Sequence, residues 1–450
     1  SDVVLGVAAS ADDVCDIISY TPFEVADQTF TGTIDITGEL KTTTLGTSNF
    51  RAGVNAGDAI ASGGNYNVVV GDEAGTAITT GDDNVAVGYS AGAAVTTGTE
   101  NTLLGGKSGE ALTVGYMNIA IGQRALQSDT KGNKTVAIGK QALATQNFTT
   151  ATDTFNTAVG HNAGYAVTTG VQNTLIGGLS GDALTVGNKN ISIGYRTLSA
   201  DTKGNKNVAV GNFALSTQNF TTATDVFNVG VGHGAGEGIT TGVQNVLIGG
   251  LAGDALTDSD ENVAVGYGAL SSDTLGQYSV AIGRDALTAQ NFTTATSTGN
   301  TAVGYLAGNA VTTGIENTLI GALAGDALTD ADFNVAVGKS ALTADTLGSR
   351  STAIGIGTLS SQNFTTATNS YNTAVGYAAG DGVTTGINNT IMGGQAGDTF
   401  TTGNRNTLIG RAAGTAITTS NSDNTFIGEA SGAAMTTGDA NTFIGRYNGE

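Results

Sequence analysis

The chain has 450 residues and a composition unlike that of a globular domain, with 69 Gly, one Pro, no Trp and only 12% charged residues. Its 17 basic and 38 acidic residues give a formal net charge of −21, which disfavours binding to nucleic acid or to an anionic membrane surface. Helix-forming residues are scarce, and short runs of Val, Ile, Thr and Phe end in Gly, so we expect an all-β protein. No apolar run approaches membrane-spanning length, and we expect no membrane insertion.

Residues 1–49 do not share the pattern of the rest of the chain. Residues 29–47 alternate apolar and polar side chains between glycines and are expected to form a small β element, with Pro22 as a boundary before it. Cys15 is the only cysteine, so no intrachain disulfide is possible, and a buried thiol is favoured over an interchain bridge. Two interpretations of this region stay open: a cap over the end of the repeats, or a segment that attaches them to something larger.

An internal repeat dominates residues 50–450. Residues 156–227 form one 72-residue super-repeat of three 17-residue pieces and one 21-residue piece, and residues 50–66 resemble a degenerate first piece. Of the 22 pieces counted from Asn67, all carry Gly at position 5 and 19 carry Asn at position 1. Such uniformity predicts a parallel β-solenoid in which each piece is one stacked turn. At about 4.8 Å per turn, the repeats would form a rod roughly 100 Å long.

Each position of a piece is expected to form a column along the stack. Asn at position 1 can hydrogen-bond from amide to amide, and Gly at position 5 can end the strand where a side chain would clash or where a positive φ is required. Position 4 is Val, Ile, Leu or Met throughout, and we expect it to be the core column of the strand. A less regular second strand is expected around positions 9–13, with two alternating cross-sections. The ladder residues that begin successive super-repeats are Asn84, Asn156, Asn228, Asn300 and Asn372, with Gly88, Gly160, Gly232, Gly304 and Gly376.

The first strand of each piece has no polar face. Its positions 2 to 4 carry Thr, Ala or aliphatic residues almost throughout, and strands that are apolar on both faces are normally covered on both sides. One face must line the inside of the solenoid, and identical neighbouring chains are the most economical cover for the other. We therefore expect a homotrimer.

The fourth piece of each super-repeat carries four extra residues within the motif QNFTTAT, at 146–152, 218–224, 290–296 and 362–368. An insertion at one fixed place in a solenoid is expected to project from one face. The motif is held to nearly one sequence while its flanking residues differ, which favours a shared task over duplication alone. Packing of the aromatic ring is the favoured task, and repeated contact with a glycan or other partner is the alternative. The candidate residues are Phe148, Phe220, Phe292 and Phe364.

Catalytic and cofactor motifs are missing from the sequence, and we expect neither enzyme activity nor a cofactor. His161 and His233 occupy the same position 6 of equivalent pieces and are interpreted as tolerated variants rather than metal ligands, because no HxH, HExxH or CxxC spacing occurs. The Gly-rich runs lack GxxxxGK[ST], so nucleotide binding is disfavoured. Acidic clusters at 82–83, 258–261 and 330–332 are interpreted as solvated turns in preference to Ca²⁺ sites.

The motifs NTAVGYLAG at residues 300–308, NVAVGY and SVAIG resemble those of trimeric β-roll fibres. This class includes the YadA-like head repeats of trimeric autotransporter adhesins and the tail-fibre or appendage proteins of bacteriophages, and the resemblance covers residues 67–450. It implies a homotrimeric fibre. The 17-residue pieces differ in length from the adhesin turns, and no coiled-coil stalk is visible, which favours the phage class. Many phage fibres of this type end in a C-terminal chaperone that is cut off after assembly, which would explain the end of the chain at Glu450 in the middle of a turn; no catalytic Ser-Lys segment of such a chaperone is visible in the sequence.

Three functions remain under consideration. The favoured one is a virion fibre that joins a virion attachment protein through its N-terminal region and contacts a glycan or protein on the host surface. The alternative is a bacterial cell-surface or extracellular adhesin or filament. An ice-binding solenoid is least favoured, because the Thr column at position 13 has no regular second Thr column beside it and breaks at each QNFTTAT.

Overall fold

The computed structural model describes residues 45–417 and 420–449. Contacts within the chain divide it into Ser1–Thr43 and Thr44–Glu450, and the second unit contains the repeats. The expectations for Cys15, for Pro22 and for nearly all of the N-terminal β element therefore lie outside the described residues.

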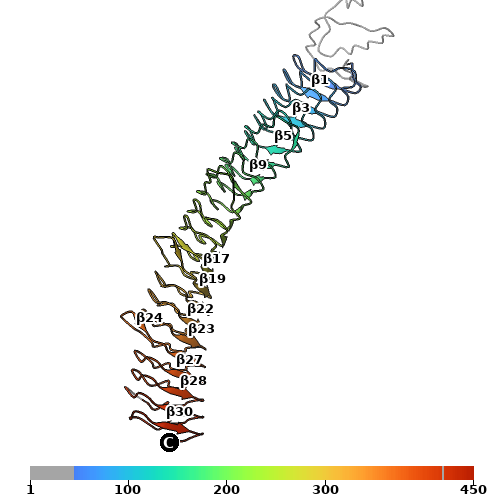
Figure 1. Cartoon of the computed structure of the whole chain (residues 1–450). Coiled ribbons are helices and arrows are strands. Elements are labelled where there is room, and N and C mark those ends of the chain that lie inside the picture. The colour runs from blue at the N-terminus through green and yellow to red at the C-terminus, as the bar shows by residue number, and fades with distance from the viewer. Residues whose placement is uncertain (1–44, 418–419, 450) are drawn as a thin grey trace, which may run out of the picture. The chain divides into compact units, whose positions relative to one another are not determined.

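The repeats form an all-β parallel β-solenoid of about 23 stacked turns, as predicted (Figure 1). Each turn supplies one three-residue strand at positions 2–4, which pairs in parallel with the strands of the turns before and after it. The degenerate first piece belongs to the stack, since its strand pairs with the next. None of the described residues lies in a helix with the length and apolarity of a membrane span. The three-residue strands are β1 Phe50–Ala52, β2 Val68–Val70, β3 Val85–Val87, β4 Thr102–Leu104, β5 Ile119–Ile121, β7 Val136–Ile138, β9 Thr157–Val159, β10 Thr174–Ile176, β11 Ile191–Ile193, β13 Val208–Val210, β15 Val229–Val231, β16 Val246–Ile248, β17 Val263–Val265, β19 Val280–Ile282, β21 Thr301–Val303, β22 Thr318–Ile320, β23 Val335–Val337, β25 Thr352–Ile354, β27 Thr373–Val375, β28 Thr390–Met392, β29 Thr407–Ile409, β30 Thr425–Ile427 and β31 Thr442–Ile444.

Short two-residue strands form only beside the QNFTTAT motif within the described residues. The last part of the motif pairs in parallel with positions 15 and 16 of the turn before it, so the insertion is joined to the stack at its far end. The pairs are β6 Gly132–Asn133 with β8 Thr152–Asp153, β12 Gly204–Asn205 with β14 Thr224–Asp225, β18 Gly276–Gln277 with β20 Thr296–Ser297, and β24 Gly348–Ser349 with β26 Thr368–Asn369.

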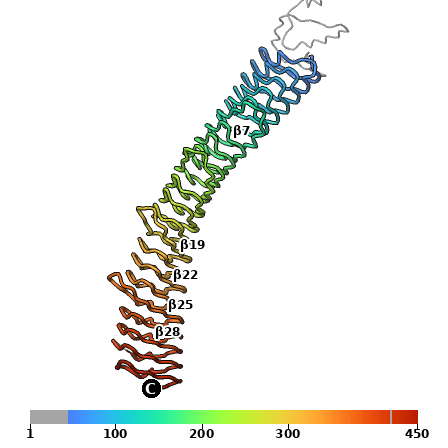
Figure 2. The backbone as a smooth tube through the Cα atoms, in the orientation of Figure 1, coloured from blue at the N-terminus to red at the C-terminus, as the bar shows by residue number. Residues whose placement is uncertain are grey.

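The expected second strand at positions 9–13 is absent from the described turns, and this prediction was wrong. Positions 7 and 9 take positive φ, for example 57° at Asn162 and 58° at Gly164, and an extended strand cannot contain such residues. The backbone there still bonds from turn to turn: the Gly164 N–H donates to Ser180 O at 2.9 Å and the Thr168 N–H to Thr185 O at 2.8 Å. Figure 2 follows the backbone through these successive turns.

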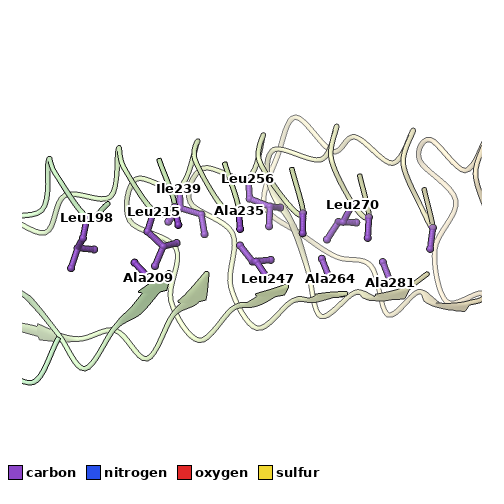
Figure 3. Packing of buried hydrophobic residues seen from close by; sticks show 14 of the residues in the cluster. Leu198, Ala209, Leu215, Ala235, Ile239, Leu247, Leu256, Ala264, Leu270 and Ala281 are labelled. Carbon is purple, nitrogen blue, oxygen red and sulfur yellow. The ribbon is translucent and has the colours of Figure 1, made fainter. Parts of the chain in front are cut away.

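Position 3, and not position 4, is the core column of the strand. The middle residue of every three-residue strand from β2 to β30 is buried, while its two neighbours are half-buried or exposed. Figure 3 shows Ala209, Leu247 and Ala264 of this column facing inward from the strands. Alternate residues of a strand point to opposite faces, so a buried position 3 places positions 2 and 4 outside. The expectation for position 4 was wrong because aliphatic character alone does not distinguish the two faces.

The core has two cross-sections that alternate in pairs of turns. In the first two pieces of a super-repeat, the wall opposite the strand is filled from position 12, as by Ile239 and Leu256; in the last two, it is filled from position 9, as by Leu198 and Leu215 (Figure 3). Where position 9 is Gly, a neighbouring leucine side chain fills the space that a side chain at position 9 would occupy. A Cβ on Gly236 would lie 2.7 Å from a methyl group of Leu247. Filling the wall from position 12 in some turns and from position 9 in others keeps the interior closely packed.

The Gly column at position 5 is required by both conformation and space. Gly304 has φ of 142°, a region that side chains rarely adopt, and a Cβ added there would lie 2.5 Å from the carbonyl oxygen of Gly321 in the next turn. The other position-5 glycines of the stack have φ between 122° and 143°. Turns can therefore stack at this corner only where no side chain is present.

The Asn column at position 1 is buried and bonded from turn to turn. The backbone N–H and the side-chain Nδ2 of Asn84 both donate to Oδ1 of Asn67, at 3.0 and 3.1 Å, and the same Nδ2 donates to Gly98 O at 2.8 Å. The column changes at each super-repeat boundary. Asn156, Asn228, Asn300 and Asn372 donate instead to the side-chain oxygen of a buried Gln.

Candidate functional site

The four Phe residues of the QNFTTAT motif are buried. Phe148, Phe220 and Phe292 are 7% exposed and Phe364 is 6% exposed, so their rings pack within the turn. The three residues that follow each Phe are exposed, as in residues 149–151. The insertion therefore has an anchored aromatic residue and a solvent-facing Thr-Thr-Ala tip. This burial favours the packing interpretation for the rings and leaves the tips, with the exposed Asn before each Phe, as the parts of the motif that solvent reaches.

A buried Gln–Asp contact holds each motif to the preceding turn. Gln146 Nε2 donates to Asp129 Oδ2 at 2.6 Å, while Asp129 Oδ1 accepts the backbone N–H groups of Phe148 at 3.2 Å and Gly132 at 3.0 Å. Gln146 Oε1 in turn accepts Asn156 Nδ2 at 2.9 Å. This arrangement explains why Gln and Phe of the motif vary so little. The same contact recurs at Gln218–Asp201, Gln290–Asp273 and Gln362–Asp345.

Sequence reasoning missed these Asp residues as part of the motif. The signal was present, since each super-repeat has Asp at position 12 of its third piece and Gln at position 12 of its fourth. Burial raises the pKa of the Asp129 and Asp345 carboxyl groups, and the hydrogen bonds from Gln146, Gln362 and the backbone oppose that rise. A carboxylate that accepts this many N–H groups has a structural role.

A second buried polar pair varies among the super-repeats. Thr135 Oγ1 lies 2.7 Å from Thr154 Oγ1, and the corresponding pairs are Ser279 with Thr298 in the third copy and Ser351 with Ser370 in the fourth. In the second copy the residues are Asn207 and Val226, and Oδ1 of Asn207 is buried without a hydrogen-bond partner among the described residues. The second super-repeat thus carries a local defect.

Cationic and aromatic side chains gather at positions 16 and 17, beside the insertion strands. Lys134 Nζ lies 2.6 Å from Asp153 Oδ2 and 5.3 Å from the ring centre of Phe155. The hydrogen bond from Lys134 lowers the pKa of Asp153, and the same contact raises the pKa of Lys134. The equivalent pair Lys206–Asp225 has the same 2.6 Å separation.

The fourth copy has an arginine at the place of Lys134 and Lys206. The Arg350 guanidinium carbon lies 4.5 Å from the ring centre of Phe333, and Arg350 Nε donates to Asn369 Oδ1 at 3.0 Å. Three of the four super-repeats therefore carry a cation next to an aromatic ring at the same edge of the stack.

The outward face of the strands is apolar along the whole sheet. Positions 2 and 4 carry only Val, Ile, Leu, Met and Thr in β2 to β31, and no charged residue occurs in either column. Several large side chains are well exposed, including Ile191 and Ile320 at 40%. Most single chains in water do not present an uncharged apolar strip of this length.

The Thr column, the two histidines and the acidic clusters that the sequence offers as candidates do not form a site in the described part of the chain. The position-13 hydroxyl groups of Thr168 and Thr185 donate to carbonyl oxygens of the next turn, at 3.1 and 2.9 Å, and are engaged inside the fold. His161 and His233 are exposed and four turns apart. The acidic clusters accept local hydrogen bonds, as Asp260 does from the Val243 N–H at 2.8 Å. Residues 45–417 and 420–449 contain no group of three or more His, Cys, Asp or Glu side chains that could hold a metal ion.

Comparisons with protein-family models, with curated proteins and with solved structures found no match to this chain.

Proposed function

We propose that this protein is the shaft of a homotrimeric structural fibre, borne by a virion as a tail fibre or similar appendage, that extends from the particle and contacts the host surface. The observation that carries the proposal is the uncharged outward face formed by positions 2 and 4. Its exposed aliphatic side chains lie on strand after strand, and burying them against another protein surface is favourable.

A second copy of the chain fits this face better than an unrelated partner. The cover must be apolar and must repeat with the spacing of the turns, and the chain itself has both properties. Copies related by a rotation axis parallel to the stack would match turn for turn, and three copies around such an axis form a closed ring in cross-section. The resemblance to trimeric β-roll fibres gives the same stoichiometry.

The role in host contact follows from what remains outside such an interface. The Thr-Thr-Ala tips recur about 19 Å apart, for four turns of about 4.8 Å, and three of the four tips have the cation–aromatic edge beside them. Repeated weak contacts along one fibre raise its overall affinity for a surface. An N-terminal attachment to the particle is part of the same proposal and concerns residues that the structure does not describe.

Assembly is tested by light scattering on the full chain, for which we expect three times the 44.5 kDa mass of one chain. Ile248→Asp places a charge on the outward face, while Leu247→Ala removes core volume from the same strand. We expect the first to dissociate the trimer with the β signal in circular dichroism retained, and the second to lower the melting temperature with the trimer retained. A wild-type particle with the mass of one chain contradicts the proposal.

Location is tested with antibodies against the repeats, applied to purified virions and to producing cells and viewed by electron microscopy. We expect label on fibres of the virion. Label on the cell surface alone would instead identify an adhesin or filament.

A further inference from the structure

A shallow groove crosses the four successive turns of the second super-repeat, residues 156–227, next to strand β14. Its volume is about 450 Å³, and its lining includes Gln172, Asn188, Lys189, Lys206 and Asp225. The first and fourth turns are about 14 Å apart at about 4.8 Å per turn, which suits a short linear ligand. Six of its seven lining residues have polar or charged side chains and the seventh is Val171, so polar groups set what the groove can recognise.

Hydrogen-bond donors without partners face this groove. Within the described part of the chain, neither the Lys189 ammonium nor the Gln172 carboxamide has a hydrogen-bond or ion-pair partner. Lys206 is bound to Asp225 at 2.6 Å but keeps two further N–H donors. Asn188 Nδ2 reaches its acceptor on Asn205 only at 3.5 Å. The site therefore offers more donors than acceptors.

The groove also carries local positive charge in an acidic protein. Lys189 and Lys206 face the single carboxylate of Asp225, and both ammonium groups lower the pKa of Asp225, with the hydrogen bond from Lys206 as the largest cause. The chain as a whole has a net charge of −21. An anionic ligand is thus attracted here and repelled by most of the remaining surface.

An aromatic ring borders the cations. Lys206 Nζ lies 4.8 Å from the ring centre of Phe227, whose side chain is 47% exposed. Phe227, Lys189 and Gln172 all have positive φ, between 58° and 61°, where Gly or Asn is less strained than a bulky residue. The fold imposes this conformation at the last position of each piece, and the chain nonetheless places large side chains there.

We propose that this groove binds an acidic oligosaccharide, with a sugar carboxylate between Lys189 and Lys206, hydroxyl groups on Gln172 and Asn188, and an apolar sugar face beside Phe227. Carboxamides and ammonium groups match the dense hydroxyl and carboxylate groups of a uronic acid chain. An exposed ring next to them matches the C–H face of a pyranose. Val171 is the only apolar residue of the lining, which gives an apolar peptide side chain little to pack against. This inference rests on the proposed function, because it names the class of host-surface molecule that the fibre contacts.

The third super-repeat supplies a matched negative variant. There, Glu261, Tyr278 and Ser297 stand in place of Lys189, Lys206 and Asp225, in the same fold. The triple change Lys189→Glu, Lys206→Tyr and Asp225→Ser therefore installs residues that this solenoid already accepts. Lys140→Glu, at the exposed position 6 of another turn, changes the net charge by the same two units away from the groove.

The experiment is a calorimetric titration of the full chain with tetragalacturonate, with maltotetraose as the neutral sugar and tetraglutamate as the acidic peptide. We expect tetragalacturonate to bind wild type and Lys140→Glu alike, more weakly as salt rises. The triple variant should lose about tenfold or more in affinity, since charge-assisted contacts are removed.

Three results would overturn the assignment: no binding of tetragalacturonate to wild type, equal binding to the triple variant, or binding of maltotetraose or tetraglutamate as tight as that of the uronate. The mass of each sample is measured by light scattering in parallel. If the protein is a trimer but does not bind tetragalacturonate, the groove assignment is wrong and the fibre proposal stands. If the protein is a single chain that binds tetragalacturonate, the fibre proposal is wrong and the groove assignment stands.

Discussion

Gln362 Nε2 donates to Asp345 Oδ2 at 2.6 Å inside the solenoid. This contact, and its equivalent in the other three copies, joins the turn that carries the insertion to the turn before it. The carboxylate also accepts the backbone N–H groups of Phe364 and Gly348, both at 3.0 Å. One residue of the turn before the insertion thus positions both ends of the bend that starts it. The constancy of Gln and Phe in the four copies of QNFTTAT follows from this geometry, because both side chains are buried.

Removing the amide should destabilise the stack. Gln362→Ala leaves a buried carboxylate oxygen and Asn372 Nδ2 each short of a partner, and we expect a loss of about 2–3 kcal/mol in the free energy of unfolding. Urea denaturation followed by circular dichroism measures it. Gln395→Ala, at an exposed position 7, is the control and should change stability by about 0.5 kcal/mol or less. Equal effects of the two changes would show that the Gln–Asp contact contributes nothing.

The buried carboxylates should give the stability a characteristic pH dependence. Burial raises the pKa of Asp129 and Asp345 in the folded state, so the fold binds these protons more tightly than the unfolded chain does. Their contribution to stability therefore falls as pH rises from about 4, the unfolded Asp value, through the folded-state pKa.

The double variant Asp129→Asn and Asp345→Asn removes this titration and isolates it from that of exposed carboxylates. Asp153 and Asp225 have lowered pKa values, and what they contribute is lost as pH falls, but they are present in both proteins. The quantity to compare is the free energy of unfolding of the double variant minus that of wild type, measured by urea denaturation. We expect this difference to be more favourable to the variant at pH 7 than at pH 4. A difference that is constant with pH contradicts the assignment.

The corner glycines should tolerate no side chain. Gly304→Ala combines a φ of 142° with a Cβ 2.5 Å from the Gly321 carbonyl oxygen, and we expect it to cost about 3 kcal/mol or more. Gly357→Ala is the matched control, because its φ is 63° and no atom lies within 4 Å of the added Cβ. Only the left-handed strain of about 1–2 kcal/mol remains there. Melting temperatures of the two variants should separate clearly, with Gly304→Ala the lower.

Restoring the buried hydroxyl pair that the second super-repeat lacks should stabilise the protein. Asn207→Thr together with Val226→Thr recreates the pair that Thr135 and Thr154 form in the first, and removes a buried unpartnered oxygen. We expect the double variant to gain about 1 kcal/mol in the free energy of unfolding. A double-mutant cycle should show favourable coupling between the two changes, since each new hydroxyl needs the other as its partner. Additive single effects would contradict the pairing.

The fold class could be predicted from the sequence because a solenoid repeats its local requirements once per turn. The Gly column at position 5 and the Asn column at position 1 can be recognised in the sequence itself, as at Gly160 and Asn156. The corner at position 5 excludes every side chain, and the buried ladder at position 1 takes Asn in 19 of 22 pieces. The turn length, the registration of the strands and the place of the insertion follow from the same count.

The tertiary structure alone decided which apolar column lies inside. Val, Ile or Leu at position 4 and Ala or Leu at position 3 are equally acceptable to a strand, so the inward direction of Leu247 and the outward direction of Ile248 depend on the walls that close the turn around them. The Gln362–Asp345 contact, too, joins residues 17 apart in sequence that become neighbours only when one turn stacks on the next. Because the repeat shows the same local requirement many times, the local conformation can be predicted from one sequence. The direction in which a side chain points depends instead on how separate turns pack together.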